Sequence, residues 1–139
     1  MSRSRCQISA ALSELVRVRE MVEEFCGAHK LPDATSNLMN LALDEVLSNI
    51  VKYAYQAPDQ GTIEIELACS DNKLTASIED RGIPFNPLEQ SVAVQRGPLH
   101  SRKEGGLGII FVKSLLDRVA YERIGDRNKM TLTTNVPSK

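Results

Sequence analysis

The order in which helical and strand patterns follow one another constrains the fold of this chain more than any other feature. Apolar residues recur at helical spacing in the first part of the chain and then alternate with polar residues, which is typical of half-buried strands. The predicted elements, in chain order, are a strand at 3–8, helices at 9–28 and 33–55, strands at 62–67 and 74–78, a helix at 108–116, and strands at 119–124 and 129–136. Turns are predicted at 57–61, 70–73 and 125–128, with a long polar loop at 84–105. This order predicts an α+β fold, a two-layer α/β sandwich in which three helices cover one face of a mixed, largely antiparallel sheet.

Composition and length then exclude several classes of protein. With 139 residues, of which 42% are apolar and 25% charged, the chain is typical of one globular domain, and we expect residues 1–139 to form it. The net charge of −1 favours neither nucleic acid nor an anionic membrane as a partner. No apolar run approaches the ~20 residues of a membrane span, and no secretory signal begins the chain. Three widely spaced cysteines favour reduced thiols over a zinc site, and hence a cytoplasmic location: Cys6, Cys26 and Cys69.

A polar pair interrupts the apolar pattern of the second predicted helix. Glu45 and Asn49 are four residues apart, so their side chains share one face of that helix. Leu38, Leu41 and Ala42 precede them on the same face, where core residues are expected. A buried carboxylate needs water, a metal or a ligand beside it. For the pair alone, an exposed polar edge on an amphipathic helix is the better interpretation.

A second polar residue stands where the strand pattern predicts a core residue. Asp80 shares the parity of Leu74, Ala76 and Ile78, so its carboxylate points toward the core at the end of the strand. Gly82 follows it and allows a sharp turn or the close approach of a ligand. An inward carboxylate beside a glycine suits an acceptor for the exocyclic amine of a purine. The alternative is an aspartate in a tight turn.

A glycine-rich segment, Gly105-Gly106-Leu107-Gly108, leads directly into the apolar helix predicted at 108–116. Such an entry leaves backbone N–H groups free at the positive end of the helix dipole, which favours phosphate binding. It matches neither the Walker A motif, which needs a second glycine before Lys113-Ser114, nor the dinucleotide fingerprint, which Phe111 interrupts. A flexible hinge before a core helix is the alternative.

The order of these three motifs resembles that of the ATP-binding superfamily of DNA gyrase, heat-shock chaperones, the mismatch-repair protein MutL and sensor histidine kinases. More narrowly, SELVRVREMVEEF, ALDEVLSNIVKYAY, EDRGIPFNP and GGLGIIFVKSLLD resemble the stand-alone anti-sigma-factor serine kinases of bacterial partner-switching systems. The resemblance covers roughly residues 8–136 and implies the Bergerat-type ATP-binding fold of the superfamily.

The resemblance implies roles for the first motif. Asn49 would coordinate Mg²⁺ through its side-chain oxygen, which is the kind of ligand this cation prefers. Glu45 would be the general base that orients or deprotonates the attacking serine or threonine hydroxyl of a partner protein.

The other motifs are implied to hold ATP. Asp80 would accept a hydrogen bond from the adenine amine, and Gly82 would let the base approach. The segment Gly106, Leu107 and Gly108 would present backbone N–H groups to the phosphates, with 87–105 as a lid. Thr131, on the last strand, would complete the adenine pocket.

Partners are also implied by the resemblance. The nucleotide site uses most of the predicted elements, so the phosphoryl acceptor is expected on another molecule. The resemblance implies that this acceptor is a STAS-type anti-anti-sigma protein and that the regulated target is a sigma factor. Relatives often pair, so a homodimer is compatible with the resemblance. Two alternatives stay open. A histidine-phosphorylating catalytic domain is disfavoured because Pro84 stands where those relatives have glycine, and a nucleotide-binding module without kinase activity has no need of Glu45.

Overall fold

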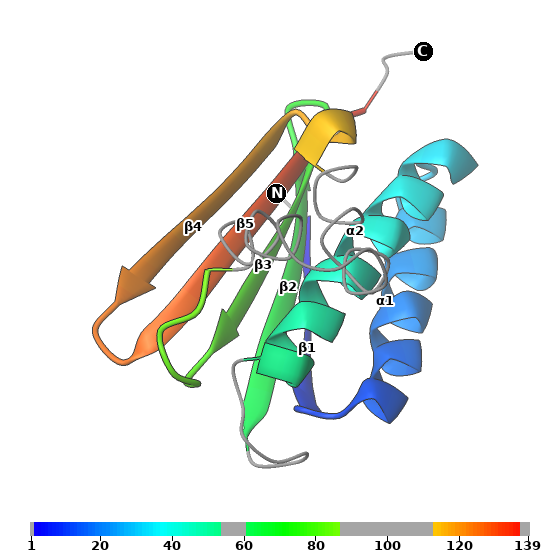
Figure 1. The fold of residues 1–139 in the computed structure, drawn as a ribbon. Coiled ribbons are helices and arrows are strands. Elements are labelled where there is room, and N and C mark those ends of the chain that lie inside the picture. Colours follow the sequence, from blue (N-terminus) through cyan, green and yellow to red (C-terminus); the bar gives the residue numbers. More distant parts are fainter. Residues whose placement is uncertain (1, 54–60, 87–112, 137–139) are drawn as a thin grey trace, which may run out of the picture.

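In the described part of the chain, a five-stranded antiparallel sheet forms one layer, and two helices cover one of its faces (Figure 1). The computed structural model describes residues 2–53, 61–86 and 113–136. The strands lie in the order β1-β2-β3-β5-β4. Their bounds are β1 Ser2–Ser9, β2 Thr62–Ser70, β3 Lys73–Asp80, β4 Arg118–Ile124 and β5 Arg127–Asn135. The α+β two-layer architecture predicted from the sequence is confirmed.

The helical layer consists of α1 (Leu15–Ala28), which a short 3-10 turn η1 (Leu12–Glu14) precedes, and α2 (Asp33–Tyr53). Residues 113–115 are also helical and belong to the segment predicted as the third helix, of which the rest lies outside the described residues. An ion pair of 2.6 Å between Arg19 and Asp44 joins α1 to α2. Within the described ranges, no helix has both the length and the apolarity that crossing a membrane requires.

The core lies between the helices and the inner face of the sheet, because side chains alternate along each strand. On β3 the buried positions are Leu74, Ala76, Ile78 and Asp80, and on β5 they include Met130 and Leu132. From α2 the fully buried apolar side chains are Met39, Ala42, Leu43, Val46, Leu47 and Ile50. Asp80 therefore lies in a row of residues that are otherwise apolar.

Both hairpins have the positive φ angles that tight turns between twisted strands require. Asp71 and Asn72, with φ of 54° and 61°, connect β2 to β3, and Gly125, with φ of 59°, begins the turn between β4 and β5. The second turn is shorter than predicted. Arg127 and Asn128, assigned to the turn from their polar composition, are the first residues of β5. Consequently Asn128 pairs with Asp80 in the sheet register.

Candidate nucleotide site

The end of β3, the beginning of β5 and the last turns of α2 lie at the same end of the sheet (Figure 1). Three of the residues predicted to form the nucleotide site come from the end of β3 and from α2. Asp80 ends β3, and Asn49 and Glu45 lie in the second half of α2. The fold therefore brings the first two sequence motifs to one end of one face.

Asp80 is buried, with 3% of its surface exposed, as its parity predicted. Its Oδ1 atom accepts hydrogen bonds from the backbone N–H of Gly82 at 2.8 Å and from Asn128 Nδ2 at 3.0 Å. Its other oxygen, Oδ2, receives no hydrogen bond from the described part of the chain. A buried carboxylate oxygen without a donor is costly, which is the situation expected of an atom that accepts a hydrogen bond from a ligand.

Asn128 is a further candidate site residue that the sequence patterns did not indicate. It is 4% exposed and its amide contacts Asp80, Ile83, Phe85 and Tyr121. Its parity with Met130 and Leu132 would have placed it on the inner face if the strand had been started two residues earlier. The turn-like composition around Gly125 hid that signal.

Asn49 is buried, with 5% of its surface exposed, and Glu45 is half-buried one turn before it. Asn49 Nδ2 donates to the backbone oxygen of Glu45 at 2.9 Å. This bond fixes the orientation of the amide and leaves its oxygen, Oδ1, available to a ligand. Burial raises the pKa of the Glu45 carboxyl, and Asp44 adds to this effect while Lys52 opposes it. A carboxyl with a raised pKa is better suited to accept a proton near neutral pH than an exposed glutamate.

The residues present fit a magnesium ion that is shared with a nucleotide. Asn49 Oδ1 is a neutral oxygen ligand, and no hydrogen bond from the described residues occupies it. No cluster of three or more histidine, cysteine, aspartate or glutamate side chains could hold a metal within those same residues. Mg²⁺ usually keeps several waters and takes few protein ligands together with substrate phosphates, so one amide is compatible with such a site.

The remaining predicted site residues are either outside the described part of the chain or on another face of the sheet. The phosphate segment Gly106, Leu107 and Gly108, and the predicted lid at 87–105, lie outside the described residues. Thr131 is described, but it lies on the opposite face of the sheet from Asp80, because Asn128, Met130 and Leu132 are the inward residues of β5. The structure thus places Thr131 on the outer face, and the residue of β5 that lies opposite Asp80 on the inner face is Asn128.

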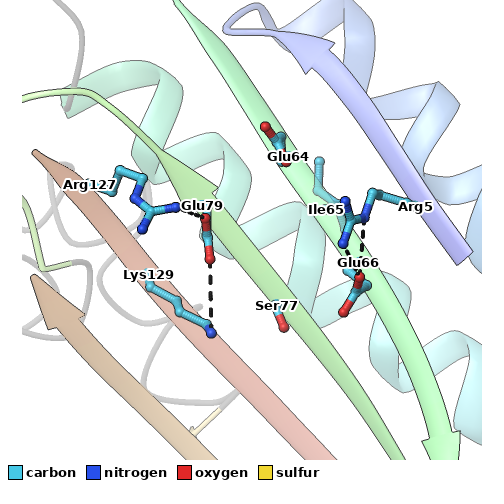
Figure 2. Close-up of a pocket in the computed structure, with 8 residues that line it drawn as sticks. All are labelled: Arg5, Glu64, Ile65, Glu66, Ser77, Glu79, Arg127 and Lys129. Carbon is cyan, nitrogen blue, oxygen red and sulfur yellow. Dashed lines mark hydrogen bonds and ion pairs between the residues drawn. The ribbon is translucent and has the colours of Figure 1, made fainter. Parts of the chain in front are cut away.

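The opposite, open face of the sheet carries many charges, and among the described residues it has no comparable buried group (Figure 2). A hollow of about 300 Å³ on this face is lined mainly by charged side chains, with the helices behind the sheet. Arg127 and Lys129 contact Glu79 at 3.1 and 3.9 Å, and Arg5 contacts Glu66 at 2.8 Å. These charges neutralise one another at the surface, so we do not assign the nucleotide to this face.

Comparison with known proteins agrees with the fold and the motifs. A family model described as histidine kinase-like ATPase domain matches residues 8–134. The serine/threonine-protein kinase BtrW of Bordetella bronchiseptica is 25% identical over 97 residues, which cover 70% of this chain and 68% of BtrW. The serine-protein kinase RsbW of Bacillus thuringiensis is 32% identical over 85 residues, or 58% of this chain. That match spans about half of the relative, 52% of its length.

Solved structures share the fold at low sequence identity. The crystal structure of the RsbU and RsbW domains of Rv1364c from Mycobacterium tuberculosis aligns with a TM-score of 0.67 and 18% identity, over 98% of this chain and 33% of that one. The catalytic domain of the histidine kinase ThkA aligns with a TM-score of 0.53 and 16% identity, over 97% and 96% of the two chains. At these identities the similarity establishes the fold alone.

Proposed function

The chain belongs to the histidine kinase-like ATPase domain family, and we propose that it is an ATP- and Mg²⁺-dependent protein kinase that phosphorylates serine or threonine on a separate protein. Relatives named serine-protein kinases match much of the chain, which supports a kinase. The proposed unit of activity is a single domain over residues 1–139.

One observation carries the proposal: a half-buried carboxyl with a raised pKa, Glu45, lies one helical turn from the buried amide of Asn49. A module that only binds nucleotide has no use for a proton acceptor beside the metal ligand. Burying part of a carboxylate also costs stability, and folds tolerate this cost mainly where chemistry requires it.

In the proposed reaction, the acceptor hydroxyl oxygen forms a bond to the γ-phosphorus of ATP. The bond between that phosphorus and the β–γ bridging oxygen breaks, and ADP leaves with the electron pair. Glu45 accepts the hydroxyl proton. Phosphoryl transfer needs mainly positioning and charge neutralisation, so one base and a well-held nucleotide are a sufficient set of groups.

The nucleotide is held by groups with separate tasks. Asp80 Oδ2 accepts a hydrogen bond from the adenine amine, and Gly82 lies directly beside that carboxylate. Asn49 Oδ1 would hold Mg²⁺, which would neutralise phosphate charge when bound. The backbone N–H groups of Gly106, Leu107 and Gly108 are assigned to the phosphates from the sequence motif.

The acceptor is proposed to be a STAS-type anti-anti-sigma protein, with a sigma factor as the regulated target and the cytoplasm as location. This assignment extends the sequence resemblance to partner-switching kinases. Pairing of two copies would be compatible with it.

The direct test incubates the purified protein with γ-³²P-ATP, Mg²⁺ and candidate STAS-type proteins. We expect acid-stable label on a serine or threonine of one candidate. Acid-labile label on histidine would favour the histidine-phosphorylating alternative. Binding of ATP without label on any protein would favour a regulatory nucleotide-binding module and contradict the kinase assignment.

A further inference from the structure

We propose that Asn128 is a positioning residue that prepares Asp80 to recognise the purine amine, and that β5 thereby determines base specificity. This inference rests on the proposed ATP-binding function. Asn128 is directly opposite Asp80 in the pairing of β3 with β5, so its side chain lies on the same inner face. At 4% exposure it is as deeply buried as the carboxylate that it contacts.

The amide of Asn128 is occupied on both ends. Nδ2 donates to Asp80 Oδ1 at 3.0 Å and to the backbone oxygen of Ile83 at 2.9 Å. Oδ1 accepts from the backbone N–H of Phe85 at 3.2 Å, from the Tyr121 hydroxyl at 2.5 Å and from Arg123 Nη1 at 3.3 Å. A side-chain amide has two N–H donors and two oxygen lone pairs, so these bonds leave it no free donor or acceptor. Asn128 is therefore unlike a ligand-contacting residue and acts through its neighbours.

The contacts also fix which end of the amide points to Asp80. The partners of Nδ2 are oxygens that can only accept, when Asp80 is ionised, and the partners of Oδ1 are donors. A reversed amide would put N–H groups against the N–H of Phe85 and an oxygen against the carboxylate, which is unfavourable. The network therefore has one consistent orientation.

The consequence for Asp80 is a division of labour between its oxygens. Oδ1 receives two donors, from Asn128 and from the Gly82 backbone, while Oδ2 receives none from the described residues. The carboxylate cannot rotate to satisfy Oδ2 without losing these bonds. Oδ2 is thus held as an acceptor for one ligand N–H group, and a ligand that presents a carbonyl oxygen or a bare C–H there is disfavoured.

The same network holds the segment after β3. Ile83 and Phe85 are tied to Asn128 through their backbone atoms, and the Gly82 oxygen accepts from Arg123 Nη1 at 2.9 Å. Arg123 pairs with Asn128 in the register of β4 with β5. The β4–β5 hairpin therefore positions residues 81–85, which we expect to lie beside the base.

The test compares ATP with purine riboside triphosphate, which has hydrogen in place of the adenine amine, by calorimetry at pH 8. We expect the wild type to prefer ATP by about tenfold, the size of one hydrogen bond to a charged acceptor. Asn128→Asp keeps the shape and the bonds to Phe85 and Tyr121, but it cannot donate to ionised Asp80. In this variant, and in Asn128→Ala, we expect the preference to fall below about threefold.

The control is Thr131→Val on the opposite face of β5, which should keep the wild-type preference. Circular dichroism shows whether each variant folds, and Tyr121→Phe, which removes only the phenolic donor to Asn128, provides a milder variant if others unfold. A full tenfold preference in folded Asn128→Asp and Asn128→Ala would overturn the inference while leaving the proposed function intact. If those two variants unfold, a full tenfold preference in folded Tyr121→Phe would do the same. A wild type that binds both nucleotides equally would reject the inference alone, whereas a wild type that does not bind ATP would also reject the proposed function.

Discussion

The two faces of the sheet differ in how they treat polar groups. The open face carries more charges, but they are exposed or half-buried and joined in ion pairs such as Arg5 with Glu66 and Arg127 with Glu79. The inner face carries few polar groups, yet Asp80, Asn49 and Asn128 are each no more than 5% exposed. The number of charges thus favours one face, and the burial of polar groups favours the other.

The difference teaches which kind of polar group indicates a site. An exposed ion pair contributes ~0–1 kcal/mol and is tolerated almost anywhere on a surface. A buried polar atom without a partner costs ~1–3 kcal/mol, so its persistence calls for a reason. Asp80 Oδ2 and Asn49 Oδ1 are such atoms within the described structure, whereas several charges of the open face are held in surface ion pairs. Variants on the two faces test whether the buried polar groups, and not the more numerous surface charges, bind the nucleotide.

Replacing the proposed base should have the largest effect. We expect Glu45→Ala to lower the rate of phosphoryl transfer by ~10²–10⁴, the usual range for a general base, while ATP binding stays within about twofold. Single-turnover transfer and calorimetry measure the two quantities separately. Glu64→Ala, on the open face, is the matched control and should leave both unchanged. Full transfer activity in Glu45→Ala would remove Glu45 from the base role even with the fold correct.

Replacing the inward carboxylate should weaken binding more than any exchange on the open face. Asp80→Asn keeps the size of the side chain but changes the acceptor for the purine amine, so we expect ATP affinity to fall by ~10–100-fold. Equilibrium binding measures this. The control is Glu79→Gln, the adjacent residue on the other face. Equal losses in the two variants would show that burial does not identify the site.

The metal ligand should be visible in how binding depends on Mg²⁺. We expect Asn49→Ala to reduce the Mg²⁺-dependent part of ATP affinity by about tenfold, corresponding to ~1.4 kcal/mol, with little change in EDTA. Titrations with and without the metal measure it. Asn37→Ala, at an exposed position of the same helix, is the control. A loss that is equal in EDTA would assign Asn49 to packing.

The raised pKa of Glu45 predicts a pH dependence with a defined sign. The folded protein holds this proton more tightly than the unfolded chain, so the carboxyl favours folding below its unfolded pKa of about 4.3, and this contribution is lost as pH rises through the folded pKa. We therefore expect Glu45→Gln to raise the melting temperature at neutral pH, since it removes an ionised, partly desolvated group. Transfer by the wild type should decline on acidification at a higher pH than an exposed glutamate would allow. A lower melting temperature for Glu45→Gln at pH 7 would contradict this account.

Periodicity was sufficient to predict the strands and the two long helices that the structure describes, and the inward direction of Asp80, because side-chain alternation is a local property. It was insufficient for Asn128, because the start of β5 is set by the turn at Gly125 and by pairing with β3, which are contacts between distant residues. The same missing register led to Thr131 being assigned to the pocket, although it pairs with Ser77 in a row that faces away from the helices. The motifs thus predicted a nucleotide site, and the strand register determined which side chains of β5 lie beside Asp80.

The smallest effect is expected from Thr131 itself, and it separates the two faces most cleanly. Thr131→Val is nearly isosteric and suits a strand, so we expect ATP affinity to change by less than about twofold and stability by less than about 0.5 kcal/mol. Calorimetry and thermal melting measure both. Substitution of Asn128, three residues away on the inner face, should instead reduce the preference for ATP over the analogue without the amine. Because strand residues alternate, a strong loss in Thr131→Val would require the nucleotide to contact the open face, and the hollow beside Arg5 and Lys129 would then become the candidate site.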